Sequence, residues 1–260
     1  MVTYSFSLRD FEFFLAIMVR IATFLFAAPL YSMRGVPARV KVGLSFFVSV
    51  LLFQSLPRDR LEYVDVIGFA ILMIKEALAG LCIGFLTNAC TYILGLAGQF
   101  IDQHIGLTMA QEFNPMTQTQ TAITGNFYNY VVIMLLLVTG LDHYLIRALT
   151  ETYELIPVGG VVFQTDNMVV GILQFLTDMF VLAFRIALPV FACIMILNSI
   201  LGIMAKVAPQ MNMFSVGMQL KVITGYLILI LTVQVLPYVS DFIYTEIKKM
   251  MVTSVGILGG

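Results

Sequence analysis

The most informative segment for the fold is Asn167 to Ala208, NMVVGILQFLTDMFVLAFRIALPVFACIMILNSILGIMAKVA. It is one of three apolar stretches of roughly 38 residues or slightly more, the others being Val64 to Ile101 and Asn212 to Lys249. A helix of that length would measure about 57 Å, against a hydrocarbon core about 30 Å thick. Each stretch is therefore either a helical hairpin or a tall helix that extends beyond the bilayer.

Two prolines decide between these forms for the last two stretches. Pro189 and Pro237 stand in mid-segment, where a proline kinks a helix and does not turn it by 180°. We therefore expect two tall, bent helices joined at AKVAPQMNMF.

The composition gives the fold class. Of the 260 residues, 60% are hydrophobic and 11% charged, and the mean hydropathy is +0.97. Soluble domains are about 45–50% apolar and 25% charged. With shorter apolar segments at Phe11–Ala28 and Val40–Leu56, the sequence predicts an all-α integral membrane protein of long kinked helices and helical hairpins. A net charge of -1 gives no support for nucleic-acid binding.

The segment after Asn126 begins apolar and becomes amphipathic beyond Val138. We expect a helix along a boundary there, because one set of residues recurs at helical spacing. The set is Leu141, Leu145, Ala148, Leu149, Thr152 and Leu155.

The distribution of basic residues conflicts with a simple set of six spans. Arg34, Arg39 and Lys41 place the first turn in the cytoplasm, which would leave Lys248 and Lys249 outside. Some apolar segments are therefore expected to pack against partner subunits and not against lipid.

A polar segment, Gln103 to Asn126, interrupts the apolar sequence. Between Lys75 and Arg147 there is no Lys or Arg, so this is not a cytoplasmic loop held at the lipid surface by basic residues. Irregular backbone at membrane depth survives only inside protein or beside water. We interpret the segment as a loop that faces an aqueous path in an assembly; the alternative is a solvated connector.

Six of the charged residues inside the apolar segments are candidates for a functional role, because ionisable groups in such segments are often functional. They are Glu12, Arg20, Lys75, Glu76, Asp178 and Arg185. Glu12 and Arg20 are about 12 Å apart along a helix and cannot pair directly. No two of the six have i,i+4 spacing, so each needs a partner on another helix or subunit. Structural contacts are favoured over a proton relay.

Gly80 and Gly84 form a small-xxx-small face that allows helices to approach closely. Cys82, Cys90 and Cys193 match no metal motif and are expected to be small buried apolar residues. The sequence has no metal-binding, nucleotide-binding or nucleophile motif. No enzyme activity, cofactor or metal is predicted.

Four strings resemble the FliR family of flagellar export-gate subunits, which is related to a subunit of virulence-associated type III secretion. They are AAPLYSMRGVPARVKVGL, QFIDQHIGLTMA, ELIPVGG and MAKVAPQMNMFSVGMQLK, in that order along essentially the whole chain. The IPVGG string is more similar to the flagellar branch.

The resemblance implies a complex with FliP and FliQ in the basal body of the bacterial inner membrane, in contact with FlhB and near FlhA. It implies a FliP-like part at residues 1–166 and a FliQ-like tall hairpin at 167–260. The family's loop that plugs the closed pore matches about Gly106 to Ala122. The residues given this role are Gly106, Leu107, Met109, Phe113, Asn114, Pro115 and Met116.

The function this predicts is a non-enzymatic channel subunit through which unfolded flagellar proteins cross the inner membrane. Two alternatives remain. One is a proton-coupled secondary transporter that uses Asp178 and Arg185. The other is a structural nucleator of the complex with no gating role.

Overall fold

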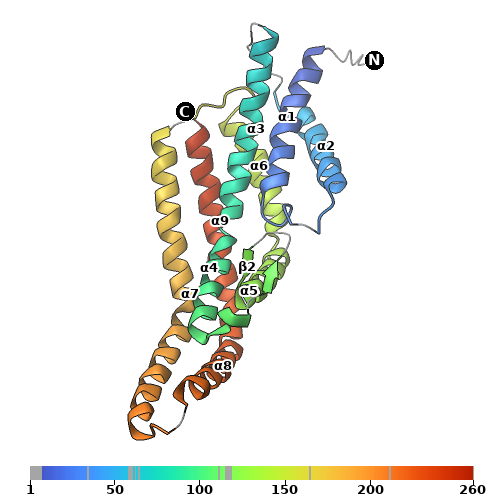
Figure 1. Cartoon of the computed structure of the whole chain (residues 1–260). Helices are drawn as coiled ribbons and strands as arrows, with labels where there is room; N and C mark the ends of the chain where they lie inside the picture. The colour runs from blue at the N-terminus through green and yellow to red at the C-terminus, as the bar shows by residue number, and fades with distance from the viewer. Residues whose placement is uncertain are drawn as a thin grey trace. The chain divides into compact units, whose positions relative to one another are not determined.

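The computed structural model describes residues 8–33, 35–57, 61, 63, 65–110, 112–114, 119–163, 165–210 and 212–259. Most of these residues are helical, and a two-stranded hairpin is the only sheet among them. The prediction of an all-α integral membrane protein is therefore confirmed (Figure 1).

The chain packs as two compact units. Unit 1 comprises Met1–Cys90, Gly140–Gln174 and Thr245–Gly260. It contains the helices α1 (Leu8–Ala27), α2 (Ala38–Ser55), α3 (Val66–Ala89) and α6 (Leu141–Leu155), with the first residues of α7 and the last of α9. The helix α1 packs against both α2 and α3 (Figure 1). Its apolar face, which includes Ile17, Ile21 and Phe24, is buried.

Unit 2 comprises Thr91–Thr139 and Phe175–Tyr244. The first segment contains α4 (Tyr92–Ile105), the 3-10 turn η1 (Leu107–Ala110), the strands β1 (Glu112–Asn114) and β2 (Thr119–Thr121), and α5 (Ile123–Val138). The second segment contains most of α7 (Thr165–Val207), all of α8 (Met213–Thr232) and of the 3-10 turn η2 (Val233–Val235), and the start of α9 (Leu236–Leu258). Its core is a cluster of buried residues from α4, η1, α5, α7, α8 and α9: Ile101, Ile105, Leu107, Tyr128, Ala187, Val190, Ile194, Ile228 and Leu236.

The two tall helices expected from the sequence are confirmed. The helix α7 has 43 residues, which corresponds to about 64 Å, and contains Pro189. The helices α8 and α9 follow each other directly through η2, which lies just before Pro237. Residues 208–212 join α7 to α8, inside the predicted connection.

Four stretches of the described chain are long and apolar enough to cross a membrane: Ala38–Ser55, Val66–Ile105, Met168–Val207 and Ser215–Leu258. The pair α5 and α6 makes a fifth if it is counted as one broken span. The helix α1 is not among them, because it carries four charged residues: Arg9, Asp10, Glu12 and Arg20.

Three details differ from expectation. The Val64–Ile101 stretch takes the tall form and not the hairpin, as one apolar stretch of 40 residues, Val66–Ile105, but it is interrupted once, because α3 ends at Ala89 and α4 begins at Tyr92. Leu155 is 69% exposed, since it is the last residue of α6 and lies at the edge of the buried stripe. Cys193 is exposed and Cys82 partly so, and only Cys90 of the three is buried.

The units cut across the division at residue 166 that the resemblance implies. That division separates a FliP-like part from a FliQ-like part by resemblance, whereas the two units are defined by packing. The division therefore stays a prediction.

Candidate functional site

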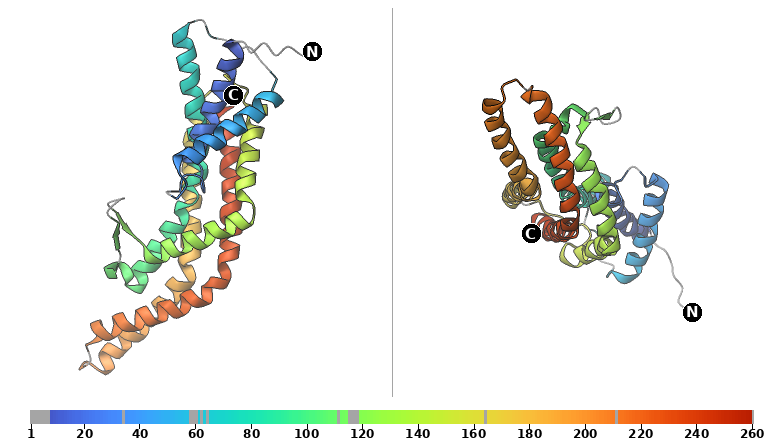
Figure 2. Two further views of the ribbon diagram at one scale, coloured as in Figure 1. Left: turned by 90° about the vertical axis from the view of Figure 1, so that its right-hand side faces the viewer. Right: turned by 90° about the horizontal axis from the view of Figure 1, so that it is seen from below.

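The polar segment between α4 and α5 contains more regular structure than the sequence suggested. Gln103 to Ile105 still belong to α4, and Thr124 to Asn126 belong to α5. Between the helices, β1 and β2 form an antiparallel pair (Figure 2). Phe113 lies opposite Gln120 in this pair. We call residues 106–122 the α4–α5 loop.

Gly106 ends α4 in the left-handed conformation, with φ of +93°. Its N–H donates to the carbonyl of Asp102 at 3.0 Å. A residue with a side chain is strained at this φ, so glycine suits the position at which the chain leaves the helix.

The residues predicted to plug a pore have different settings. Leu107 is buried in the core of unit 2, in the same cluster as Ile105 and Tyr128. Met109 lies in η1, and Phe113 and Asn114 lie in β1. Pro115 and Met116 lie outside the described residues. Leu107 is therefore placed to anchor the loop to the core of unit 2.

The two ends of the loop are joined where α4 meets α5. A Cβ added to Gly98 would lie 2.1 Å from the Cα of Gly125, so the two backbones are in contact at this point. One turn later, the buried carboxylate of Asp102 accepts hydrogen bonds from the backbone N–H of Thr124, at 3.3 and 3.4 Å. We call Gly98, Asp102, Thr124 and Gly125 the loop base.

Asp102 was not among the residues selected from the sequence. A signal was present, however, because Asp102 is the only acidic residue between Glu76 and Glu112, and no Lys or Arg occurs in that interval. A carboxylate in apolar sequence without a nearby cation needs a partner elsewhere. The sequence does not show that the partner is the start of a helix.

A second cluster, in unit 1, brings together two of the charged residues selected from the sequence. Arg20 of α1 and Glu76 of α3 form a buried ion pair, with side chains 1% and 0% exposed. The pair is bidentate: Nε donates to Oε2 at 2.5 Å, and Nη2 donates to Oε1 at 3.0 Å. Two-point pairing of this kind is the strongest geometry available to arginine and carboxylate.

The remaining polar atoms of the pair bind the segment that follows α6. The Nη1 of Arg20 donates to the carbonyl of Ile156 at 2.9 Å, and the N–H of Gly159 donates to Oε1 of Glu76 at 2.8 Å. The guanidinium lies 4.3 Å from the ring centre of Tyr153. We call these five residues the Arg20–Glu76 network. It holds α1, α3 and the end of α6 together.

Gly80 and Gly84 lie where α3 contacts α1. A Cβ on Gly80 would lie 2.1 Å from the carbonyl oxygen of Arg20. A Cβ on Gly84 would lie 2.8 Å from the carbonyl oxygen of Phe24. The two helices therefore touch along their backbones on the side where the ion pair forms.

The other charged residues have separate surroundings. Glu12 accepts a hydrogen bond from the hydroxyl of Tyr63 at 2.6 Å. This bond raises the pKa of Tyr63 above its usual value, as does the adjacent negative charge. Lys75 is exposed, next to the buried Glu76.

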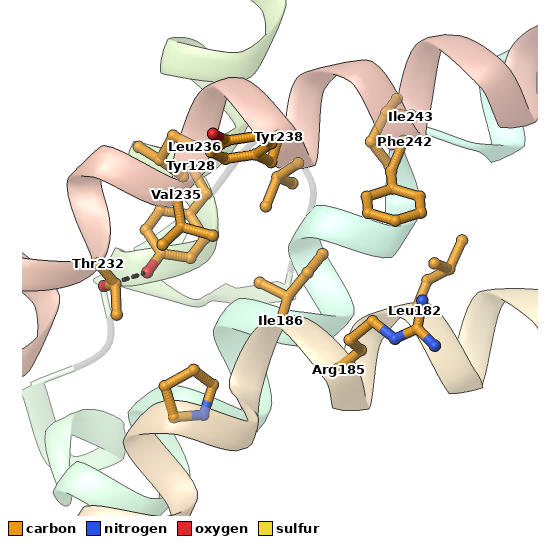
Figure 3. Close-up of a pocket in the computed structure, with 12 residues that line it drawn as sticks. Tyr128, Leu182, Arg185, Ile186, Thr232, Val235, Leu236, Tyr238, Phe242 and Ile243 are labelled. Carbon is orange, nitrogen blue, oxygen red and sulfur yellow. Dashed lines mark hydrogen bonds between the residues drawn. The ribbon is translucent and has the colours of Figure 1, made fainter.

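Arg185 lies at a largely apolar pocket of about 130 Å³ between α7 and α9 (Figure 3). Its guanidinium is 5.8 Å from the ring centre of Phe242. The hydroxyls of Tyr128 and Thr232 are 3.3 Å apart in the same pocket. Asp178 is half-buried two turns earlier on α7. The described part of the chain has no cluster of three metal-ligating side chains.

The family comparison covers most of the chain. The family described as bacterial export proteins, family 1, matches residues 11–247. The chain is 28% identical over 251 residues to the flagellar biosynthetic protein FliR of Bacillus subtilis (strain 168), covering 96% of each chain.

Other flagellar relatives also match over most of the chain. The flagellar biosynthetic protein FliR of Aquifex aeolicus (strain VF5) is 29% identical over 214 residues, 82% of each chain. The protein of the same name from Escherichia coli (strain K12) is 24% identical over 235 residues, 90% of this chain and 89% of that protein. The resemblance to the FliR family is therefore confirmed. The chain belongs to the bacterial export proteins, family 1, as a member of the FliR family. Because it also has long apolar helices, it is a membrane component of the flagellar export apparatus.

Proposed function

We propose that this chain is a non-enzymatic channel subunit of the flagellar export gate, through which unfolded flagellar proteins cross the inner membrane. The observation that carries the proposal is the α4–α5 loop. It is a polar excursion whose two ends meet at the loop base, between helices of a membrane protein. In this proposal, the segment from Met109 to Met116 closes the resting channel.

The proposed setting is the basal body, in one complex with FliP and FliQ, in contact with FlhB and near FlhA. Exposed apolar side chains on both tall helices are consistent with partner subunits around this chain. Examples are Phe180, Phe184 and Leu188 on α7, and Ile223, Leu227 and Ile230 on α8. In the same proposal, residues 1–166 form the FliP-like part and residues 167–260 the FliQ-like hairpin.

Replacing Gly106–Ala122 by a short Gly/Ser linker should raise ion leakage through the assembled complex, because the residues that close the channel are removed. The measurement is single-channel conductance in planar bilayers, compared with that of wild-type complex prepared in the same way. A Gly/Ser segment of the original length serves as a control that separates loop length from side-chain content.

Both variants keep the loop base but remove Leu107 from the core of unit 2, so the conductance is compared only for complexes whose mass shows wild-type composition. Unchanged conductance in a correctly assembled complex would favour the structural nucleator over the gate. Transport by the purified single chain would favour the transporter.

A further inference from the structure

Asp102 is a buried carboxylate whose described hydrogen-bond donor is the start of a helix. The side chain is 0% exposed, in the same helix as the buried Ile101 and Ile105. Both of its oxygens lie within 3.4 Å of the backbone nitrogen of Thr124. The described part of the chain pairs it with no Lys or Arg. A buried charge of this kind is costly unless hydrogen bonds or an opposite charge stabilise it.

The helix α5 lacks a cap of its own. Its N-cap residue is Ala122, which has no side-chain acceptor and makes no side-chain cap hydrogen bond. Alanine is among the poorest residues at this position. Thr124 is the second residue of α5, where an N-cap side chain normally binds. Asp102 therefore caps α5 from a different helix, and the partial positive charge of the helix N-terminus stabilises the carboxylate in turn.

The contact between glycines places the cap. Gly98 and Gly125 bring α4 and α5 to backbone contact one turn from Asp102. One turn beyond Asp102, the chain leaves α4 at Gly106. The next residue, Leu107, is buried in the core of unit 2. The first and last residues of the loop are thus fixed on one framework.

We propose that Asp102 is the positioning residue of the gate: by capping α5 from α4, it fixes both ends of the α4–α5 loop in the closed arrangement. This inference rests on the proposed function of the loop. Loss of the carboxylate should free the first turn of α5 and shift the hairpin, while the core of unit 2 and the assembly of the complex persist.

The test uses Asp102→Ala and Asp102→Asn in the co-expressed complex. The first readout is hydrogen exchange of the amides of residues 123–126, which should be roughly tenfold faster in Asp102→Ala, as for the loss of an N-cap. The second readout is ion leakage through the assembled complex, which should also be higher in Asp102→Ala than in wild type. Asp102→Asn keeps one acceptor oxygen and should lie between Asp102→Ala and wild type in both.

Asp65→Ala provides the matched control. Asp65 is also an aspartate at the start of a helix, as the N-cap residue of α3, but it is exposed and makes no side-chain cap hydrogen bond. Its replacement should change neither readout. If Asp102→Ala does not assemble, Asp102→Asn carries the test.

The outcomes separate the two claims. If the linker variant leaks and both Asp102 variants behave like wild type, the positioning role is wrong and the gate stands. If the linker variant does not leak, the gate is wrong, and the proposal that Asp102 positions it falls with it. Hydrogen exchange at the amide of Thr124 then still shows whether Asp102 caps α5.

Discussion

Removing either partner of the Arg20–Glu76 pair should destabilise the chain by about 3–5 kcal/mol, because the remaining charge stays buried without a counter-charge. Arg20→Ala would leave the Glu76 carboxylate with the N–H of Gly159 as its described donor. It would also release the carbonyl of Ile156 and uncover the ring of Tyr153. Both changes act on the junction of α1, α3 and the end of α6.

Cys90 offers a reporter for this loss. Its thiol is 0% exposed and lies in the same unit as the ion pair. In a Cys82→Ser, Cys193→Ser background, a thiol-reactive dye should label Cys90 only when unit 1 opens. Arg20→Ala and Glu76→Ala should both lower the temperature of labelling.

The chain contains a matched exposed pair. Arg147 and Glu151 form an i,i+4 ion pair on α6, with side chains 81% and 57% exposed. Exposed pairs of this type contribute only about 0.3–0.5 kcal/mol. Arg147→Ala should therefore leave the labelling temperature almost unchanged. An equal shift for Arg20→Ala and Arg147→Ala would contradict the account of the network.

A double variant separates the ion pair from packing. Arg20→Met with Glu76→Met removes both charges and keeps long side chains, so it should be less harmful than the two single changes added together. If the effects simply add, the two side chains act independently.

Gly98→Ala should disrupt the loop base, although it adds only one methyl group. The new Cβ would lie 2.1 Å from the Cα and 2.2 Å from the backbone N of Gly125. Backbone cannot move aside as a flexible side chain can, so α4 and α5 must separate. Overpacking of this kind costs about 1–3 kcal/mol and occasionally more.

Gly95→Ala is the control on the same helix. A Cβ there meets no atom within 4 Å. Alanine in a helix is favoured over glycine by up to about 1 kcal/mol, so this variant should be neutral or stabilised. Thermal unfolding of the purified complex, followed by helical circular dichroism, should rank Gly95→Ala at or above wild type and Gly98→Ala well below. Equal midpoints would show that the glycine contact is not required.

The long helices could be predicted because they depend on local information. Length, hydropathy and the mid-segment Pro189 and Pro237 suffice to favour tall helices over hairpins, and the structure has them. The buried stripe of α6 follows from periodicity at all but its last residue, Leu155.

The pairings could not be predicted, because they depend on which helices meet. The sequence selects Arg20 and Glu76 separately, 56 residues apart, and does not indicate that they pair. Asp102 was missed for the same reason, since its hydrogen-bond partner is the start of α5, 22 residues away along the chain. Short strands such as β1 and β2 lack the length to give an alternating pattern.

The most direct test of the central claim, that this chain works as one subunit of a hetero-oligomeric gate, is native mass spectrometry of the chain co-expressed with its FliP and FliQ partners. We expect a discrete hetero-oligomer that contains one copy of this chain. A monomer or homo-oligomer whose mass does not depend on those partners would contradict it.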